Sequence, residues 1–502
     1  MAVEDFPKVY LTGSSDLSRG RSLQVKLREG LALNQASDGT LAVIFELGQK
    51  IFFKQMPASV RQVFVELASE GATIDELSEK ILAADGGDAL TRFYLHFNQL
   101  LHHGAIQHAA VVAGRSIAAI VGLAQNYQFH LQQLDIDRPY YLSRFAYCRR
   151  EENRLLLECP LGYAQIVLHH SLAAQVLWAL AQPHSVRQLA EHLPLLGIEG
   201  VADFFQLLLN AQALTPVSDE YAAPAEDGDA TLGQWSFHDL LFHSRSRYGR
   251  GSYPFGATFR HIDRFPPLPA LRSSPEGQKI DLYRPALDCL DDLPLIQVME
   301  ERRSVYDYED SHPITVKQLG AFLYRVARVR SLGDMPVQTE RGQAVMQISS
   351  RPYPAGGKCY EIEIYLTVDR CDGLSSGLYY YNPQEHGLVL LRERDRWVDA
   401  LLNYASISAP RGKPQVLIHL AARFGRMSWK YDAIAYATTL KHVGILYQSM
   451  YLVATAMGLG PCALGSGDSD TFATAARTDY LAETSVGDFM LGSLPTTDTI
   501  DQ

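Results

Sequence analysis

Cysteine and metal-binding motifs are scarce in this sequence. Six cysteines are spread over 502 residues and none forms a C-x-x-C pair, so neither a disulfide scaffold nor a thiolate zinc site is indicated. The 16 histidines include no H-E-x-x-H motif, which leaves no sequence signal for a catalytic metal. We therefore expect reduced, mostly buried thiols and no metal ion.

Long apolar runs and an excess of positive charge are also missing. No run approaches the ~18 residues that cross a bilayer, and the opening MAVEDFPKVY lacks the basic region and apolar core of a signal peptide. The 45 Lys and Arg residues are outnumbered by 56 Asp and Glu residues, which gives a formal net charge of −11. Because nucleic-acid affinity comes mostly from cations placed on phosphates, we expect a cytoplasmic protein that binds neither membrane nor nucleic acid.

An internal repeat organises the first part of the chain. Alternating apolar and polar residues around Gly48 predict a β-hairpin at 39–55, and the pattern recurs around Gly162 at 153–170. Three amphipathic helical segments and a short apolar tail follow each hairpin, which is the order of a winged helix. The expected helices are 60–71, 73–82 and 91–106 in the first copy, and 173–184, 185–194 and 202–216 in the second.

The domain boundaries are predicted from the repeat and from the change, after it, to alternating strands and long helices. We expect an α+β protein with two winged-helix-like modules, at 1–120 and 121–217. Residues 218–233 are acidic and rich in small side chains, so they are interpreted as a linker. Strands and long helices alternate through the remaining domain, 234–502. Its clearest expected strands are 361–368 and 414–422, and its longest expected helix is 435–460.

Arg302, Arg303 and Ser304 form the first candidate site. They follow an apolar helical segment at 295–300. Two guanidiniums and a hydroxyl at a helix end can hold a phosphate through charge-assisted hydrogen bonds. The alternative is a solvated last helical turn, where arginine is favoured by the helix dipole.

A glycine loop and a lysine–tyrosine pair form two further candidates. The loop of Pro354, Ala355, Gly356 and Gly357 leads into a strand, and glycine lets backbone amides approach a flat ligand, although it also suits a tight turn. Lys430-Tyr431 precedes the long helix and could supply a base and a proton relay. A surface lysine beside a core tyrosine is the alternative.

Two other segments stand out. The sequence G-L-G-P-C-A-L-G at 458–465 follows the long helix, where glycine is typical of a helix cap and turn. Residues 234–263 interleave basic and aromatic side chains, a pattern that fits RNA or a planar substrate but that we interpret as an interdomain or dimer contact.

The order of these motifs resembles the nitroreductase-like flavoproteins, and most closely their SagB/McbC-type branch, the FMN-dependent azoline dehydrogenases of ribosomal peptide biosynthesis. The segment W-x-F-H-D-L-L-F-H-x-R-S-R-x-G-R at 235–250 is also similar to that branch. With two winged-helix modules, the chain resembles a cyanobactin thiazoline oxidase. The resemblance covers residues 235–495, and over 1–217 it extends only to the architecture of peptide-recognition elements.

This resemblance implies a flavin site. It places the FMN phosphate on Arg302 and Ser304, and Arg303 beside the flavin edge. The loop from Pro354 to Gly357 would contact the isoalloxazine, and many relatives carry serine where this chain has Ala355. The remaining implied residues are Leu464 or Gly465, whose amide would face the reactive flavin nitrogen, and the catalytic pair Lys430 and Tyr431. The family places FMN at a homodimer interface. The tail 492–502 has no cation that could serve as a further phosphate ligand.

The expected activity is FMN-dependent oxidation of thiazolines, and of oxazolines, in a heterocyclised precursor peptide, with dioxygen as the expected electron acceptor. One alternative is an NAD(P)H-dependent nitroreductase-like flavin reductase. Another is a non-enzymatic winged-helix regulator with a flavin sensor. The regulator is disfavoured because the expected third helices carry few cations, one arginine in the first copy and none in the second.

Overall fold

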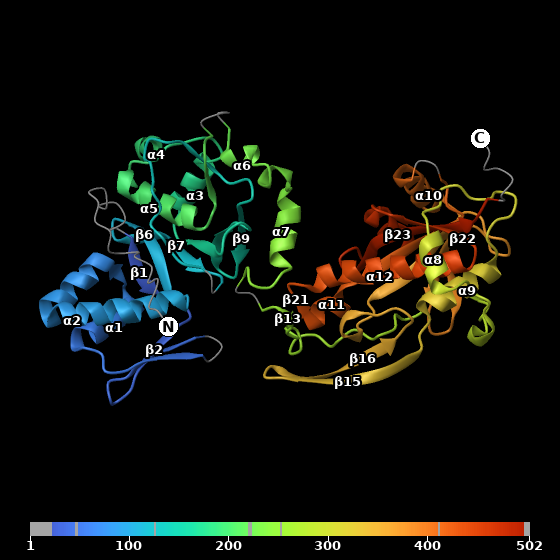
Figure 1. Cartoon of the computed structure of the whole chain (residues 1–502), viewed down its shortest axis with the longest axis horizontal. Helices are drawn as coiled ribbons and strands as arrows, with labels where there is room; N and C mark the ends of the chain where they lie inside the picture. Colours follow the sequence, from blue (N-terminus) through green and yellow to red (C-terminus); the bar gives the residue numbers. More distant parts are fainter. Residues whose placement is uncertain are drawn as a thin grey trace. The chain divides into compact units, whose positions relative to one another are not determined.

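The chain forms two compact units, Met1–Ser252 and Tyr253–Gln502 (Figure 1). The computed structural model describes residues 23–45, 49–124, 127–218, 223–251, 254–409 and 412–495. Gly48, the expected turn of the first hairpin, lies outside these residues. Both units combine antiparallel sheets with helices, which confirms the expected α+β class.

A seven-stranded antiparallel sheet joins the two halves of the first unit. Its strand order is β5-β1-β6-β7-β11-β10-β9. The junction is the pairing of β7 with β11, where Ile120 lies opposite Ile166. The strands are β1 (Gln24–Leu27), β5 (Ala72–Thr73), β6 (Ile106–Val112), β7 (Arg115–Gly122), β9 (Tyr147–Glu151), β10 (Arg154–Glu158) and β11 (Ala164–Leu168).

The helices of this unit follow the sequence pattern. The expected helices 73–82 and 91–106 correspond to the two parts of α2, which meet at a kink where Gly86 takes a non-helical φ of 78° and ψ of −170°. Thr73 and Ser185 cap their helices as capping boxes. The helices are α1 (Ala58–Ser69), α2 (Ile74–His102), α3 (Ser171–Ala179), α4 (Val186–His192) and α5 (Gly197–Asn210).

The repeat holds in element order but not in strand pairing. The first hairpin pairs with β2 in a separate three-stranded sheet, whereas the second hairpin, β10–β11, belongs to the large sheet. The tail of the first copy, β6, also enters the large sheet, but β12 pairs only with β8. Two equivalent winged helices are therefore not seen. These smaller sheets comprise β2 (Ala32–Gln35), β3 (Leu41–Ile44), β4 (Lys50–Phe53), β8 (Tyr140–Leu142) and β12 (Leu214–Pro216).

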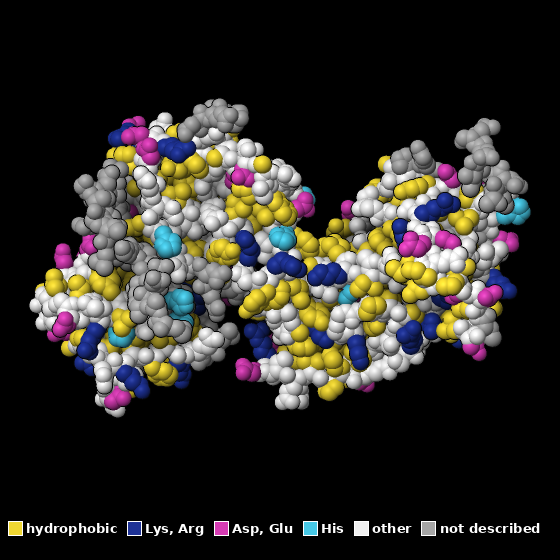
Figure 2. Space-filling model, viewed as in Figure 1, with side chains coloured by type: hydrophobic (Ala, Val, Ile, Leu, Met, Phe, Trp, Pro, Cys, Tyr) yellow, Lys and Arg dark blue, Asp and Glu magenta, His cyan; other side chains and the backbone are white. Residues whose placement is uncertain are grey.

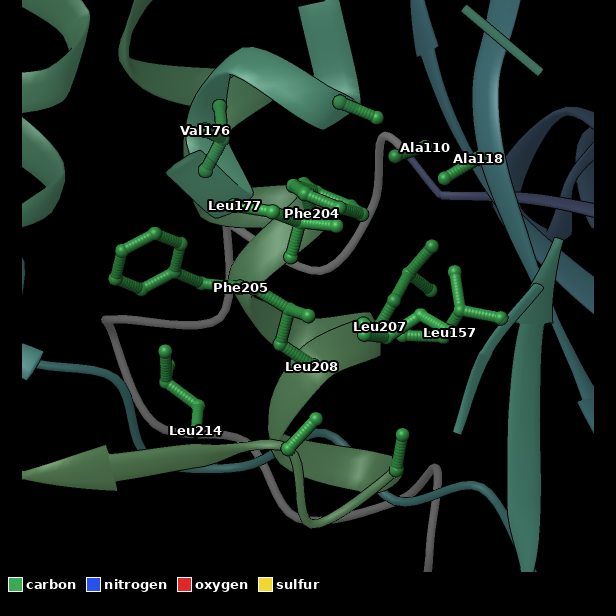
Figure 3. Packing of buried hydrophobic residues seen from close by; sticks show 14 of the residues in the cluster. Ala110, Ala118, Leu157, Val176, Leu177, Phe204, Phe205, Leu207, Leu208 and Leu214 are labelled. Carbon is green, nitrogen blue, oxygen red and sulfur yellow. The ribbon is translucent and has the colours of Figure 1, made fainter. Parts of the chain in front are cut away.

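The larger core of the first unit crosses the boundary expected at residue 120. Phe204 and Leu208 of α5 belong to the same buried cluster as Ala110 on β6, Ala118 on β7 and Leu157 on β10 (Figure 3). The first half also has its own cluster between α1, α2 and the small sheet. The strands β6 and β7 thus belong to the first half in sequence, but Ala110, Ala118 and Ile120 pack with the second half while Ile106 packs with the first.

Buried carboxylates fix the segment that follows the repeat. Glu226 accepts hydrogen bonds from the Ser143 hydroxyl and the Arg144 amide, both at 2.7 Å. Glu158 is fully buried and pairs with Arg245 of α7 at 2.7 Å. The elements concerned are α6 (Ala225–Gly228), η2 (Leu232–Gln234) and α7 (Phe237–Arg245). The linker expected at 218–233 stays a prediction, but its described part packs on the first unit.

The second unit is a three-layer sandwich around a seven-stranded antiparallel sheet, ordered β14-β19-β18-β17-β20-β23-β22. Side chains of β17 alternate between the layers, since Ile364 and Leu366 join the core under α9 and α12 while Tyr365 joins that under α10 and α13. The strands are β14 (Lys279–Asp281), β17 (Ile362–Val368), β18 (Gly377–Asn382), β19 (Gly387–Glu393), β20 (Val416–Arg423), β22 (Leu459–Leu464) and β23 (Glu483–Ser493). The helices are α8 (Leu295–Glu301), α9 (Val316–Ala327), α10 (Arg396–Ser408), α12 (Ala435–Ala456) and α13 (Ser469–Ala476).

The structure corrects one sequence prediction in this unit and refines another. Lys430 and Tyr431 precede the long helix as expected, but each belongs to an element of its own: Lys430 ends a short helix, α11 (Phe424–Lys430), and Tyr431 opens β21 (Tyr431–Asp432). The glycine-rich segment after α12 is not a turn but the edge strand β22, after a helix cap at Gly458 with φ 64°. An edge position tolerates Pro461, which has no amide hydrogen to donate.

Two small antiparallel pairs flank α11. One joins β13 (Gly256–Ala257) to β21, and the other is the long hairpin of β15 (Ser331–Thr339) and β16 (Gly342–Ser350) (Figure 1). None of the described helices is long and apolar enough to cross a membrane.

Candidate active site

Lys430 is a buried lysine at the C-terminal end of α11. Its side chain has 7% relative exposure, and its Nζ donates a hydrogen bond to the Gly357 carbonyl oxygen at 3.1 Å. The ring centroids of Phe259 and Tyr431 lie 5.7 Å and 5.6 Å from Nζ. A helix C-terminus and two aromatic faces all favour a cation, so the ammonium is accommodated although no carboxylate in the described residues pairs with it.

A second segment holds the lysine–tyrosine pair from the other side. In the β13–β21 ladder, Ala257 lies opposite Tyr431, and the Phe259 amide donates to the Lys430 carbonyl at 3.2 Å. Arg260 and Asp432 form an ion pair at 2.9 Å beside this ladder. The backbone on both sides of the pair is therefore fixed by hydrogen bonds.

The glycine loop lies directly against the same pair. Gly357 has a φ of 59°, and a β-carbon built there would lie 2.5 Å from Nζ of Lys430 and closer still to Oη of Tyr431. Lys358 and Tyr360 also have positive φ values, 56° and 44°, which non-glycine residues rarely adopt. The loop is strained, and only glycine fits the space that the two side chains leave at position 357.

The amide of Gly356 is already bound within the chain. It donates to Nε2 of His442 at 2.7 Å, and Nδ1 of His442 lies 2.7 Å from Oε1 of Glu361. Both His442 and Glu361 are buried. The sequence analysis missed both residues. The available signal was that polar side chains occupy positions where hydrophobic ones are expected. Glu361 stands at the start of an apolar strand, and His442 lies on the buried face of α12.

Arg426 fixes the base of the loop. It is fully buried and donates to the Cys359 carbonyl through Nε at 2.9 Å and Nη2 at 2.7 Å. Burial lowers the pKa of Arg426 to about 10 and raises the pKa of the Cys359 thiol to about 11. Burial also raises the pKa of Tyr431, so at neutral pH its phenol keeps its proton.

A separate apolar cluster surrounds the pair. It includes Trp429 and Met427 of α11, Val337 and Met346 of the β15–β16 hairpin, and Cys359, with Tyr431 packed at its edge. The hairpin and α11 therefore form a hydrophobic wall next to Lys430.

Arg302 and Ser304 meet the edge strand β22 through Tyr451. The hydroxyls of Ser304 and Tyr451 lie 2.7 Å apart, and the Ala463 amide donates to the same tyrosine oxygen at 2.9 Å. The Arg302 guanidinium lies 5.1 Å from the centroid of the Tyr451 ring. On the same strand, the Leu464 carbonyl accepts from the Tyr447 hydroxyl at 3.4 Å.

The predicted residues therefore fall into two groups along α12. One contains Gly356, Gly357, Lys430 and Tyr431, and the other contains Arg302 and Ser304 next to the strand that ends at Leu464. His442 and Tyr451 mark the two groups on the helix, nine residues or ~14 Å apart along its axis. Pro354 and Ala355 precede the first group in sequence. Arg303 and Gly465 are exposed beyond the second.

The second group has the chemistry of an anion site. Among the described residues, no carboxylate lies within ion-pair distance of Arg302, and Arg303 likewise has none. Their positive charges stand beside the Ser304 hydroxyl, a donor set that suits a phosphate. A β-carbon added to Gly465 would meet no atom within 4 Å, so backbone at this position is open to a flat ligand. These residues fit a phosphate-bearing aromatic cofactor such as FMN.

In the part of the chain that the structure describes, no three His, Cys, Asp or Glu side chains are placed to hold a metal ion.

Family models match three segments of the chain. The model for the ThcOx helix-turn-helix domain matches residues 20–131, that for the cyanobactin oxidase ThcOx matches 140–252, and that for the nitroreductase family matches 299–492. The chain belongs to the ThcOx family of cyanobactin oxidases. In this cyanobactin oxidase one helix-turn-helix domain is matched, and a second winged-helix module stays a prediction.

Individual relatives of this cyanobactin oxidase align mainly with about half of the chain or less. A nitroreductase candidate of Methanocaldococcus jannaschii is 28% identical over 190 residues, which are 38% of this chain and 86% of that protein. A chain of the E. coli microcin synthetase McbBCD complex with truncated pro-MccB17 bound is 19% identical, covering 52% of this chain and 92% of that chain with a TM-score of 0.33. A nitroreductase candidate from Desulfovibrio desulfuricans in complex with FMN is 16% identical, covering 40% of this chain and 86% of that chain, with a TM-score of 0.24.

We predict that Gly357→Ala displaces the lysine–tyrosine pair, whereas Gly458→Ala does not. Both glycines have similar φ values, 59° and 64°, so both substitutions lose about 1 kcal/mol or more to backbone strain. Only the β-carbon at position 357 collides with Lys430 and Tyr431. Amine labelling followed by mass spectrometry should find Lys430 more reactive in Gly357→Ala alone. Equal reactivity in both variants would contradict this contact.

Proposed function

We propose that this cyanobactin oxidase uses FMN to convert thiazolines, and oxazolines, of a heterocyclised precursor peptide into the aromatic azoles. The observation that carries the proposal is the contact of Lys430 with Gly357 inside a nitroreductase-family domain. It places a buried amine and a phenol at a loop suited to a flat ring. The aromatisation removes two electrons and two protons, so it needs a proton acceptor as well as an oxidant.

In this proposal the chain's own residues manage the protons. In its neutral amine form, Nζ of Lys430 accepts the acidic ring proton and becomes the ammonium, and the Gly357 carbonyl holds Nζ in place. Tyr431 contributes a phenol that stays protonated at neutral pH and orients the ring by donating a hydrogen bond. The apolar wall around Met427 and Trp429 excludes water from the amine. Bound FMN supplies the two-electron oxidation, with dioxygen as the proposed final acceptor.

The cofactor contacts are proposed from the two groups along α12. Arg302 and Ser304 hold the phosphate and Arg303 lies at the flavin edge. Because the Gly356 amide already binds His442, we propose that Pro354–Gly357 contacts the flavin by shape rather than through that amide. Leu464 or Gly465 supplies the amide for the reactive flavin nitrogen, since Gly465 is open on its side-chain face.

The helix-turn-helix region is proposed to bind peptide and not DNA. Within this region the expected third helix, 91–106, carries a single arginine, Arg92, which is little positive charge for a DNA groove. Outside it, residues 200–208 of α5 are all buried, so that helix acts as core and cannot enter a groove. Both observations disfavour the regulator alternative.

The nitroreductase-family match keeps one enzymatic alternative, an NAD(P)H-dependent flavin reductase. The two activities separate in one assay of the purified protein. Azoline oxidation predicts a loss of two mass units from a thiazoline peptide without added nicotinamide, whereas a reductase consumes NAD(P)H and leaves the peptide unchanged.

We predict that Lys430→Ala and Tyr431→Ala abolish azoline oxidation but retain FMN. Loss of a general base costs roughly 100-fold to 10,000-fold in rate, and neither side chain is assigned to the phosphate. The measurements are flavin content, melting temperature and conversion of a thiazoline peptide. Near-normal conversion by Lys430→Ala with intact flavin would remove Lys430 from the reaction.

We predict that Arg302→Ala releases FMN. Losing a charged hydrogen bond to phosphate weakens binding roughly tenfold to hundredfold. Flavin occupancy after dialysis is the measurement, and Arg330→Ala is a control that removes an exposed arginine outside both groups. Full occupancy in Arg302→Ala would exclude this residue as a phosphate ligand.

We predict a homodimer that buries the outer face of α12. That face carries Tyr436, Leu440, Gly444 and Gln448 at four-residue spacing, and Gly444 has open space where a side chain would stand. Exposed hydrophobic side chains of α8 lie next to this face of α12. Figure 2 shows hydrophobic side chains in the region over α8, α9 and α12. A self-complementary apolar face favours a two-fold dimer.

Light scattering at micromolar concentration should give twice the chain mass, and Gly444→Arg should give the monomer. A wild-type monomer would overturn the dimer.

A further inference from the structure

A chain of buried hydrogen bonds ends on the glycine loop. The Glu361 carboxylate meets Nδ1 of His442, and Nε2 of His442 accepts the Gly356 amide hydrogen, each over 2.7 Å. Glu361 has no exposed surface and His442 has 3%. Neither residue belongs to the proposed phosphate site or to the lysine–tyrosine pair.

The amide contact determines the proton arrangement on His442. A nitrogen that accepts a hydrogen bond carries no proton, so Nε2 is bare and the imidazole is neutral. Nδ1 then carries the hydrogen and donates it to Glu361. The carboxylate thus selects the one tautomer that can accept the Gly356 amide.

The glycine pair is consequently held at both ends. His442 binds the amide of Gly356, and Nζ of Lys430 binds the carbonyl of Gly357. Directly after these contacts the backbone is strained, since the non-glycine residue Lys358 has a φ of 56°. Strained backbone persists only where its surroundings over-determine it.

We propose that Glu361 and His442 are a positioning pair: they set the glycine loop so that the Gly357 carbonyl meets Lys430 and orients its amine. The consequence for catalysis rests on the proposed function of Lys430. The consequence for the loop does not, because the hydrogen bonds belong to the chain itself.

The same unit contains a matched control. His419 and Asp488 form a second buried imidazole–carboxylate pair at 2.7 Å, and Nε2 of His419 lies 2.8 Å from the Thr367 hydroxyl. This pair sits inside the sheet and contacts no residue of the glycine loop. Removing either histidine costs a buried hydrogen-bond network, but only one of them holds the loop.

The test compares His442→Leu, His442→Gln and His419→Leu. Hydrogen exchange by mass spectrometry on residues 353–360 should accelerate in His442→Leu, recover towards wild type in His442→Gln, whose side-chain oxygen can accept the Gly356 amide, and stay unchanged in His419→Leu. In turnover of a thiazoline peptide, His442→Leu should lower kcat about 100-fold, the effect of a misplacement of about 1 Å, with KM little changed.

Unchanged exchange in His442→Leu, or equal acceleration in His419→Leu, would overturn the positioning role. So would a wild-type protein whose nitrogen-15 histidine spectrum places the His442 proton on Nε2, a measurement that does not depend on any variant folding. If wild-type protein turns over no azoline, the proposed function fails, while the exchange and tautomer results still decide this inference. Exchange that accelerates without any fall in kcat would show that the loop is held but does not orient Lys430.

Discussion

The contact between the Gly357 carbonyl and Nζ of Lys430 is the constraint on which the candidate site of the second unit depends. A buried amine needs an acceptor, and here the acceptor is backbone, so the loop must approach the lysine more closely than any side chain allows. That requirement explains the glycine, the positive φ values that follow it at Lys358 and Tyr360, and the fully buried Arg426, which holds the Cys359 carbonyl two residues further along. The β13–β21 ladder and the apolar cluster formed by the β15–β16 hairpin and α11 surround the amine on its other sides.

In this arrangement the residues proposed to react differ from the residues that hold them in position. The residues proposed to move protons, Lys430 and Tyr431, have few contacts of their own beyond the loop and the aromatic rings. The residues that fix them, among them Glu361, His442 and Arg426, are buried in the sheet and in α11 and α12. Because Lys430 and Tyr431 make so few contacts, their positions depend on the residues that surround them. A displacement of a reacting group by about 1 Å can lower the catalytic rate roughly 100-fold.

The sequence predicted the class of fold, the principal helices and strands of both units, and the residues that gather at the glycine loop. Those successes follow from local patterns: the period of hydrophobic residues, capping boxes at Thr73 and Ser185, and a family-like order of motifs. It failed where the outcome depends on distant partners. Nothing local shows that Gly458 ends a helix and starts an edge strand, or that α11 ends at Lys430. His442 and Glu361 were overlooked because their meaning comes from a contact across 81 residues.

The shared sheet of the first unit has an evolutionary consequence. Strands β6 and β7 belong to one half in sequence but bring Ala110, Ala118 and Ile120 into the core of the other, and the β7–β11 pairing makes one sheet of the two halves. A half joined in this way cannot be exchanged or lost as a cassette without exposing part of the other half's core. Substitutions in either half must therefore be tolerated by the other, which makes the two halves one unit of selection.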